Sequence, residues 1–214
     1  MEKDLNLKFI NDAIIFTCQK LNELKINYYI VGAIGAYIDA NIPLERIHED
    51  LDILIEEKSV NKLSKVFENT DYIFYDNRLK NNKVLNHYGY PDGEHEVIAN
   101  YKYNNFHIGF FLFRKNRQDY TIIDYFKENN EIKKLERTLP IKYFYFQYNN
   151  EPKNYCGINL KSVRKELIYK NKKIMNRKKD LFDIQKLENY INEDILNNLS
   201  GLSKHRKIKT ISVN

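Results

Sequence analysis

Two aspartates, Asp50 and Asp52, stand one residue apart at the start of an apolar run, "DLDILI". Side chains of an extended strand alternate between its two faces, so both carboxylates are expected on one side and Leu51 and Ile53 on the other. Two like charges on one face repel each other unless a cation lies between them. Because Mg²⁺ prefers oxygen ligands, the spacing predicts a site for Mg²⁺ or Mn²⁺ at Asp50 and Asp52.

A glycine-containing turn precedes this strand. The short apolar run "YYIV" is followed by Gly32 and Ala33, and "IGAYIDA" (34–40) predicts a short helix. A turn that opens a helix offers backbone N–H groups to phosphate, and the start of a helix favours negative charge. The order of strand, turn, helix and Asp-x-Asp strand therefore suits the handling of a metal-bound triphosphate.

Residues 28–57 resemble the core motif of the DNA polymerase β-type nucleotidyltransferase superfamily. The similarity is closest to the small bacterial aminoglycoside and lincosamide nucleotidyltransferase-like proteins, which commonly carry Arg-x-His-x-Asp-x-Asp. This pattern is matched by Arg46, His48, Asp50 and Asp52. The turn departs from the family pattern at Ala33, where Gly or Ser is usual.

A second similar stretch covers residues 155–188, where the family has a Lys-bearing helix followed by a helix that starts Arg/Lys-Asp-x-x-Asp. Lys179, Asp180 and Asp183 match that start. Each of the three also has a plain structural interpretation, as a favourable or solvated residue of the helix.

The resemblance implies a metal-dependent nucleotidyltransferase that moves a nucleoside monophosphate from ATP or another NTP to a hydroxyl of a small, antibiotic-like molecule. It implies that Asp50 and Asp52 ligate the metal and act in catalysis. The residues that it implies for nucleotide binding are Gly32, Ala33, Arg46, His48 and Lys179.

Active relatives place a third carboxylate on a later strand, and the corresponding run here is "FHIGFFLF". This run offers His107 and Gly109 on the expected face. His107 is therefore predicted to act as a neutral base or a metal ligand, since imidazole can exchange a proton near neutral pH. Other acids that could approach the site are Glu94, Glu96 and Asp124.

Alternative functions stay open at this point. If the missing acid disarms the site, the same fold serves as a nucleotide- or RNA-binding module; a toxin-type transferase acting on tRNA or protein is a further alternative. The net charge of +6 permits an anionic partner without requiring one. Structural interpretations also remain: Arg46 as a partner of Asp50 or Asp52, His48 as an ordinary loop residue, and His107 as a half-buried sheet residue.

The composition predicts a globular protein. The 214 residues are 43% hydrophobic and 30% charged, and no apolar run approaches the ~18 residues of a membrane span. We expect a cytoplasmic protein without a membrane partner and with two unbridged cysteines, Cys18 and Cys156. The oligomeric state is not predicted.

Hydrophobic periodicity predicts an α/β (α+β) fold, with a nucleotidyltransferase-like mixed sheet flanked by helices. We expect a catalytic domain over 1–155 and a C-terminal helical segment over 156–214 that packs on it and ends in a frayed basic tail. Ser59 and Ser162 are predicted to cap helices. The expected strands are 28–31, 51–55, 72–75, 97–103, 106–113 and 119–126, and the other expected elements are a helix over 5–25 and a long polar loop over 77–96.

Overall fold

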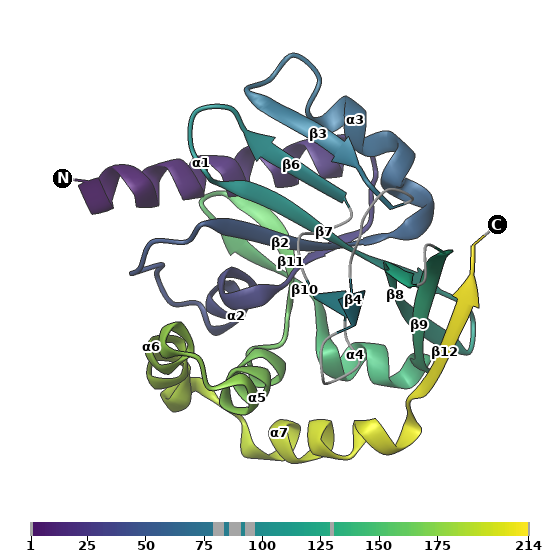
Figure 1. The fold of residues 1–214 in the computed structure, drawn as a ribbon. Coiled ribbons are helices and arrows are strands. Elements are labelled where there is room, and N and C mark those ends of the chain that lie inside the picture. Colours follow the sequence, from purple (N-terminus) through teal and green to yellow (C-terminus); the bar gives the residue numbers. More distant parts are fainter. Residues whose placement is uncertain (1, 79–83, 86–90, 93–96, 129–130, 214) are drawn as a thin grey trace.

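A computed structural model describes residues 2–78, 84–85, 91–92, 97–128 and 131–213 (Figure 1). Within these residues the chain forms one mixed sheet of ten strands, a separate pair of short strands and seven α-helices. The α/β (α+β) class predicted from the sequence is confirmed. None of the described helices is both long and apolar enough to cross a membrane.

The first part of the chain folds as its hydrophobic pattern predicts. Helix α1 carries Ile10, Ile14, Cys18 and Leu21 on one face, and all four are fully buried. In β2 the aspartates are half-buried while Leu51 is fully buried, so the strand alternates as expected. The elements are α1 (Glu2–Glu23), β1 (Tyr28–Ile30), α2 (Gly32–Ala40), β2 (Asp50–Glu56), η1 (Glu57–Lys62), α3 (Leu63–Val66) and β3 (Tyr72–Asp76).

The sheet runs in the order β10-β11-β1-β2-β7-β8-β9-β12, and β6 also pairs with β7 and carries β3 at its other edge. Strand β2 is parallel to β7, and β1 is parallel to β11. The strands of this middle part are β4 (Val84–Leu85), β5 (Pro91–Asp92), β6 (Val97–Tyr101), β7 (His107–Lys115), β8 (Asp119–Glu128) and β9 (Glu131–Pro140).

The C-terminal part contributes both helices and sheet. In Figure 1 the helices α5, α6 and α7 gather on the side of the sheet where α2 lies. The elements are η2 (Ile141–Tyr143), α4 (Phe144–Gln147), β10 (Tyr148–Tyr155), β11 (Ile158–Val163), α5 (Lys165–Met175), α6 (Lys178–Leu187), η3 (Glu188–Tyr190), α7 (Glu193–Ser200), η4 (Leu202–His205) and β12 (Lys207–Ser212).

Two local predictions are wrong. The helix expected from Ser59 is mostly a 3₁₀ segment followed by one α-helical turn. Ser162 does not cap a helix; it is fully buried in β11, pairs with Ile30, and α5 begins only at Lys165. The alternating burial of "INLKSV" fits a strand, and the helical pattern starts just after it.

The basic tail is also not frayed over its described residues. Strand β12 pairs antiparallel with β9 through six successive residues, from Lys207 opposite Thr138 to Ser212 opposite Lys133. Its exposed Lys-rich side faces solvent, as is common for an edge strand. Because β11 and β12 both lie beyond residue 155 and belong to the main sheet, the sheet continues across the predicted domain boundary, which remains a prediction.

Candidate active site

The register between β2 and β7 brings the predicted catalytic residues together. Asp50 lies directly opposite His107, and Asp52 opposite Gly109. Residues in register on neighbouring strands point to the same face and stand about 5 Å apart. Asp50, Asp52 and His107 therefore share one face of the sheet, and the next strand adds Asn100, which pairs with His107.

Gly32 lies against Asp52 at the start of α2. Its φ of +65° is in the left-handed region, and a Cβ placed on it would lie 2.7 Å from the Asp52 Oδ2 atom. The Val31 backbone N–H also donates to the Asp52 carbonyl oxygen at 2.9 Å. A side chain at position 32 would fill the space where the Asp52 carboxylate meets the first turn of α2.

A buried ionic network holds the C-terminal helices beside this face. Asp183 on α6 is fully buried and accepts two hydrogen bonds from Arg46, at 2.8 and 2.9 Å, and one from the Tyr37 hydroxyl at 2.6 Å. The Lys172 Nζ atom lies 2.8 Å from Asp183 and 2.9 Å from Asp180. Thus Arg46 forms these hydrogen bonds with Asp183, while Asp50 also lies close enough to act on its charge.

The cations of this network keep Asp180 and Asp183 ionised. Burial alone would raise the pKa of Asp183, but the hydrogen bonds from Arg46, Lys172 and Tyr37 lower it to about 2. The pKa of Asp180 is likewise held below its ordinary value against burial, by Arg177 and Lys172.

These charges bring cations close to Asp50. Arg46, Lys172 and Arg177 supply three cations against the two carboxylates of Asp180 and Asp183, and the carboxylate of Asp50 nearby balances the third. Asp50 is close enough to contribute to the raised pKa of both arginines, whose largest favourable influences are their hydrogen bonds to Asp183 and Asp180.

The remaining predicted nucleotide-binding residues differ in position. His48 is 2% exposed, and its ring lies edge-on to Tyr37 with the ring centroids 6.1 Å apart. Burial and the nearby Arg46 lower its pKa to about 4, so His48 is neutral and belongs to the interior next to the network, unlike an ordinary loop residue. Lys179 is exposed on the first turn of α6, and Ala33 follows Gly32 in the first turn of α2.

The alternative acids do not join Asp50 and His107 within the described residues. Asp124 on β8 forms an ion pair with Arg137. Strand β8 pairs with β7 only from Leu112 onward, about 16 Å along β7 from His107. Glu94 and Glu96 lie outside the described residues.

Two carboxylates from β2 are thus the acidic ligands that the described site offers. Across the described part of the chain, no group of three or more His, Cys, Asp or Glu side chains is arranged to hold a metal ion. Mg²⁺ commonly takes one or two carboxylates and completes its shell with water and substrate phosphates. Asp50 and Asp52, beside the space kept open by Gly32, fit that mode of binding.

A polar cavity of about 270 Å³ adjoins His107. Sequence reasoning missed this cavity and the part that Tyr37 plays in the buried network, because neither follows from spacing along the chain. An asparagine-rich turn was the available signal for the cavity. Its lining residues are Ile98, Asn100, Asn104, Asn105, Phe106 and His107.

No protein-family model and no curated protein sequence matches the chain. Solved structures do match. The solution structure of the antibiotic-resistance factor ANT(2'')-Ia aligns with a TM-score of 0.58 at 10% identity over 92% of both chains. The crystal structure of ANT(2'')-Ia in complex with adenylyl-2''-tobramycin gives 0.59 at 8% identity, over 92% of this chain and 98% of the other.

The lincomycin-bound crystal structure of the lincosamide antibiotic adenylyltransferase LnuA aligns with a TM-score of 0.54 at 12% identity, over 83% of this chain and 96% of that one. At such low identity these likenesses show the fold. The nucleotidyltransferase-like fold predicted from the sequence is confirmed.

Proposed function

We propose that the protein is a metal-dependent nucleotidyltransferase that moves a nucleoside monophosphate from ATP or another NTP to a hydroxyl of a small, antibiotic-like molecule. One observation carries this proposal: Asp50, Asp52 and His107 share a face of the sheet beside the Gly32 turn. The fold supports it, since two of the similar structures contain adenylyl-2''-tobramycin and lincomycin. The proposed setting is the cytoplasm, where NTPs are available.

Each residue has a role in this proposal. Asp50 and Asp52 would hold Mg²⁺ or Mn²⁺, which orients the α-phosphate and neutralises charge on the departing pyrophosphate. Backbone N–H groups of Gly32 and Ala33 bind phosphate oxygens at the positive end of α2.

His107 is the proposed general base. A ring nitrogen accepts the proton of the acceptor hydroxyl as that oxygen attacks the α-phosphorus. The new bond joins the acceptor oxygen to phosphorus, and the bond from the α-phosphorus to the bridging oxygen breaks to release pyrophosphate. The position of His107 opposite Asp50 supports this role, because the base must reach the attacking oxygen close to the bound phosphate.

A second candidate is a nucleotide-binding module of the same fold. It is favoured by the imidazole at the position where active relatives carry a third acid. The two candidates predict different outcomes: the transferase releases pyrophosphate and labels an acceptor, whereas the binding module binds NTP without turnover.

The test incubates the protein and Mg²⁺ with labelled NTPs and with lincosamides, aminoglycosides, tRNA or the protein alone. We expect label on a small hydroxylated acceptor in the wild type and none in Asp50→Asn or Asp52→Asn. Asp12→Asn, an exposed carboxylate on α1, is the matched control and should behave as wild type. NTP binding without transfer to any acceptor would support the binding module, and label on tRNA or on the protein would support the toxin-type alternative.

A further inference from the structure

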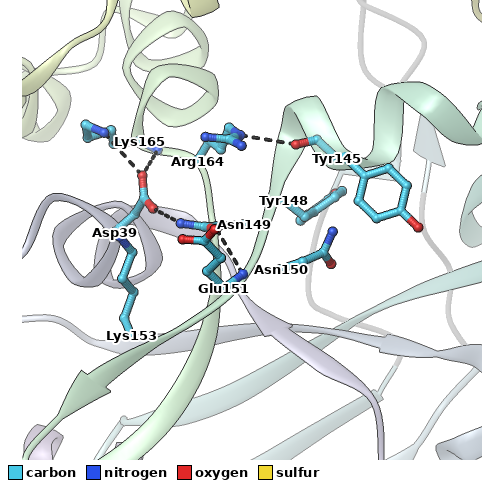
Figure 2. Close-up of a pocket in the computed structure, with 9 residues that line it drawn as sticks. All are labelled: Asp39, Tyr145, Tyr148, Asn149, Asn150, Glu151, Lys153, Arg164 and Lys165. Atoms are coloured by element: carbon cyan, nitrogen blue, oxygen red, sulfur yellow. Dashed lines mark hydrogen bonds and ion pairs between the residues drawn. The ribbon is translucent and has the colours of Figure 1, made fainter.

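A second cavity, of about 370 Å³, lies beside α2 (Figure 2). It forms where the end of α2, the start of β10 and the start of α5 meet. Its lining residues are Asp39, Tyr145, Tyr148, Asn149, Asn150, Glu151, Lys153, Arg164 and Lys165.

The cavity is separate from the catalytic face. Strands β11 and β1 lie between β10 and β2, so the two strands are about 14 Å apart across the sheet. Gly32 opens α2 at the catalytic end, and Asp39 lies near the other end of this nine-residue helix.

Asp39 is already saturated by protein groups. Its Oδ1 atom accepts from the Asn149 amide at 2.9 Å, and its Oδ2 atom accepts from the Lys165 backbone N–H at 3.1 Å and from Lys165 Nζ at 3.5 Å. The Asp39 side chain is only 3% exposed. It therefore fixes Asn149 and Lys165 in place through the contacts drawn as dashed lines in Figure 2.

Hydrogen bonds also orient the side-chain amides of Asn149 and Asn150. The Asn150 Oδ1 atom accepts from the Tyr29 hydroxyl at 2.8 Å, which leaves the Asn150 amide N–H groups as donors. The Asn149 Oδ1 atom accepts from the Glu151 backbone N–H at 3.1 Å.

Among the lining groups that these contacts leave available, most are hydrogen-bond donors. Arg164 uses Nε to bind the Tyr145 carbonyl oxygen at 3.2 Å, which leaves its terminal N–H groups for another acceptor. No described residue pairs with the Lys153 ammonium. Among the lining residues, Glu151 is the one carboxylate besides Asp39, and it is exposed at the rim. The positive end of the eleven-residue α5 adds to this donor-rich field.

We propose that this cavity binds a phosphate-class oxyanion through Arg164, Lys153 and the Asn150 amide. An acceptor-rich anion satisfies these donors, and guanidinium and ammonium groups both bind phosphate. The ligand is either free inorganic phosphate or the phosphoryl group of a small metabolite. The proposal does not depend on nucleotidyl transfer.

The test titrates inorganic phosphate and, separately, AMP while the side-chain amide NMR signals of Asn149 and Asn150 are followed. We expect saturable shifts of both signals. Stronger binding of AMP than of phosphate would identify a phosphorylated metabolite as the ligand, and the reverse would identify the free anion. Shifts confined to residues around Asp50, or no saturable shift at millimolar phosphate, would overturn the proposal.

Substitutions of lining residues test whether phosphate binds in this cavity. Arg164→Gln and Lys153→Gln should each weaken phosphate binding about tenfold or more, whereas Lys8→Gln, which removes an exposed charge on α1, should leave it unchanged. The double variant Asp50→Asn/Asp52→Asn should retain it. Melting temperatures identify any variant that fails to fold; if one does, the wild-type titration still decides. Binding that survives in both Gln variants, or that is altered in the aspartate double variant, would contradict the assignment.

Discussion

The backbone conformation of Gly32 determines how closely the carboxylate of Asp52, proposed to be catalytic, can approach the start of α2. In Gly32→Ala, the new methyl group would lie 2.7 Å from Asp52 Oδ2 and the residue would keep a positive φ. We expect a loss of about 1–2 kcal/mol in the free energy of unfolding from the left-handed conformation, and a much larger effect on catalysis, of at least about 100-fold, from displacement of Asp52.

Chemical denaturation and transfer assays measure the two effects. The control is Gly201→Ala, where φ is −81° and the added Cβ meets the Asn198 carbonyl oxygen at an ordinary 3.6 Å. Full activity in Gly32→Ala would show that Asp52 does not need the space beside the turn.

The resemblance of the sequence predicts an acid at the position of His107, so replacing His107 by Ala and by Asp tests different properties. His107→Ala should lower the rate of transfer about 100-fold or more by removing the base, while NTP affinity stays the same. His107→Asp restores the relatives' carboxylate and should match or exceed the wild-type rate. Unchanged transfer in His107→Ala would remove this residue from the chemistry.

His48 contributes a pH dependence of stability. Its folded pKa of about 4 lies below the ordinary value of 6.5 because the ring is buried. Between these two pH values the unfolded state binds a proton that the folded state does not, so the free energy of unfolding should fall as the pH falls from 6.5 to 4, by up to roughly 3 kcal/mol. His48→Gln stays neutral and should flatten the stability curve in this window; urea denaturation at each pH measures it, and an unchanged slope would contradict the assignment.

At the scale of elements, Asp183 ties α6 to α2 and to the segment that carries Arg46. Asp183→Asn leaves Arg46 and Lys172 buried with too little negative charge and should cost about 3–5 kcal/mol in the free energy of unfolding. The exposed Asp194 on α7 gives the matched control, since Asp194→Asn should change stability by less than about 0.5 kcal/mol. Urea denaturation compares the two, and equal stability would mean that the network does not anchor the helices.

The elements with strong periodicity could be predicted from the sequence, and those that depend on partners could not. Helix α1 and strand β2 follow directly from the burial of positions such as Ile14 and Leu51. By contrast, β12 forms because it can pair with strand β9. The segment "KIKTIS" alone does not indicate that this pairing partner exists. The same reason explains β11, whose strand character comes from pairing with β1 and β10.

The residues of the candidate site also differ in how far the sequence alone could predict their positions. The Asp-x-Asp spacing was sufficient to place Asp50 and Asp52 on one face, because alternation is local. The pairing of Arg46 with Asp183 links residues far apart in the chain and required the fold. The cavity at Asp39 likewise depends on three elements that meet only in space.

At the scale of the whole molecule, the net charge is +6, and the two candidate sites lie at opposite ends of α2. One lies at the start of α2 beside Asp50, close to the cations of the buried network, and the other lies at the end of α2, where Arg164 and Lys153 line the cavity. A triphosphate at the first site and a phosphate-class anion at the second would both lie close to cationic side chains.

The central claim, nucleotidyl transfer at the carboxylates of β2, is tested most directly by one measurement. Wild type and Asp52→Asn are incubated with Mg²⁺, NTP labelled on the α-phosphate and a panel of lincosamide and aminoglycoside acceptors, and both labelled product and pyrophosphate are quantified. The account predicts equimolar labelled acceptor and pyrophosphate from the wild type, with a loss of at least about 100-fold in Asp52→Asn. Equal product formation by the two proteins, or NTP binding by the wild type with no transfer to any acceptor, would contradict it.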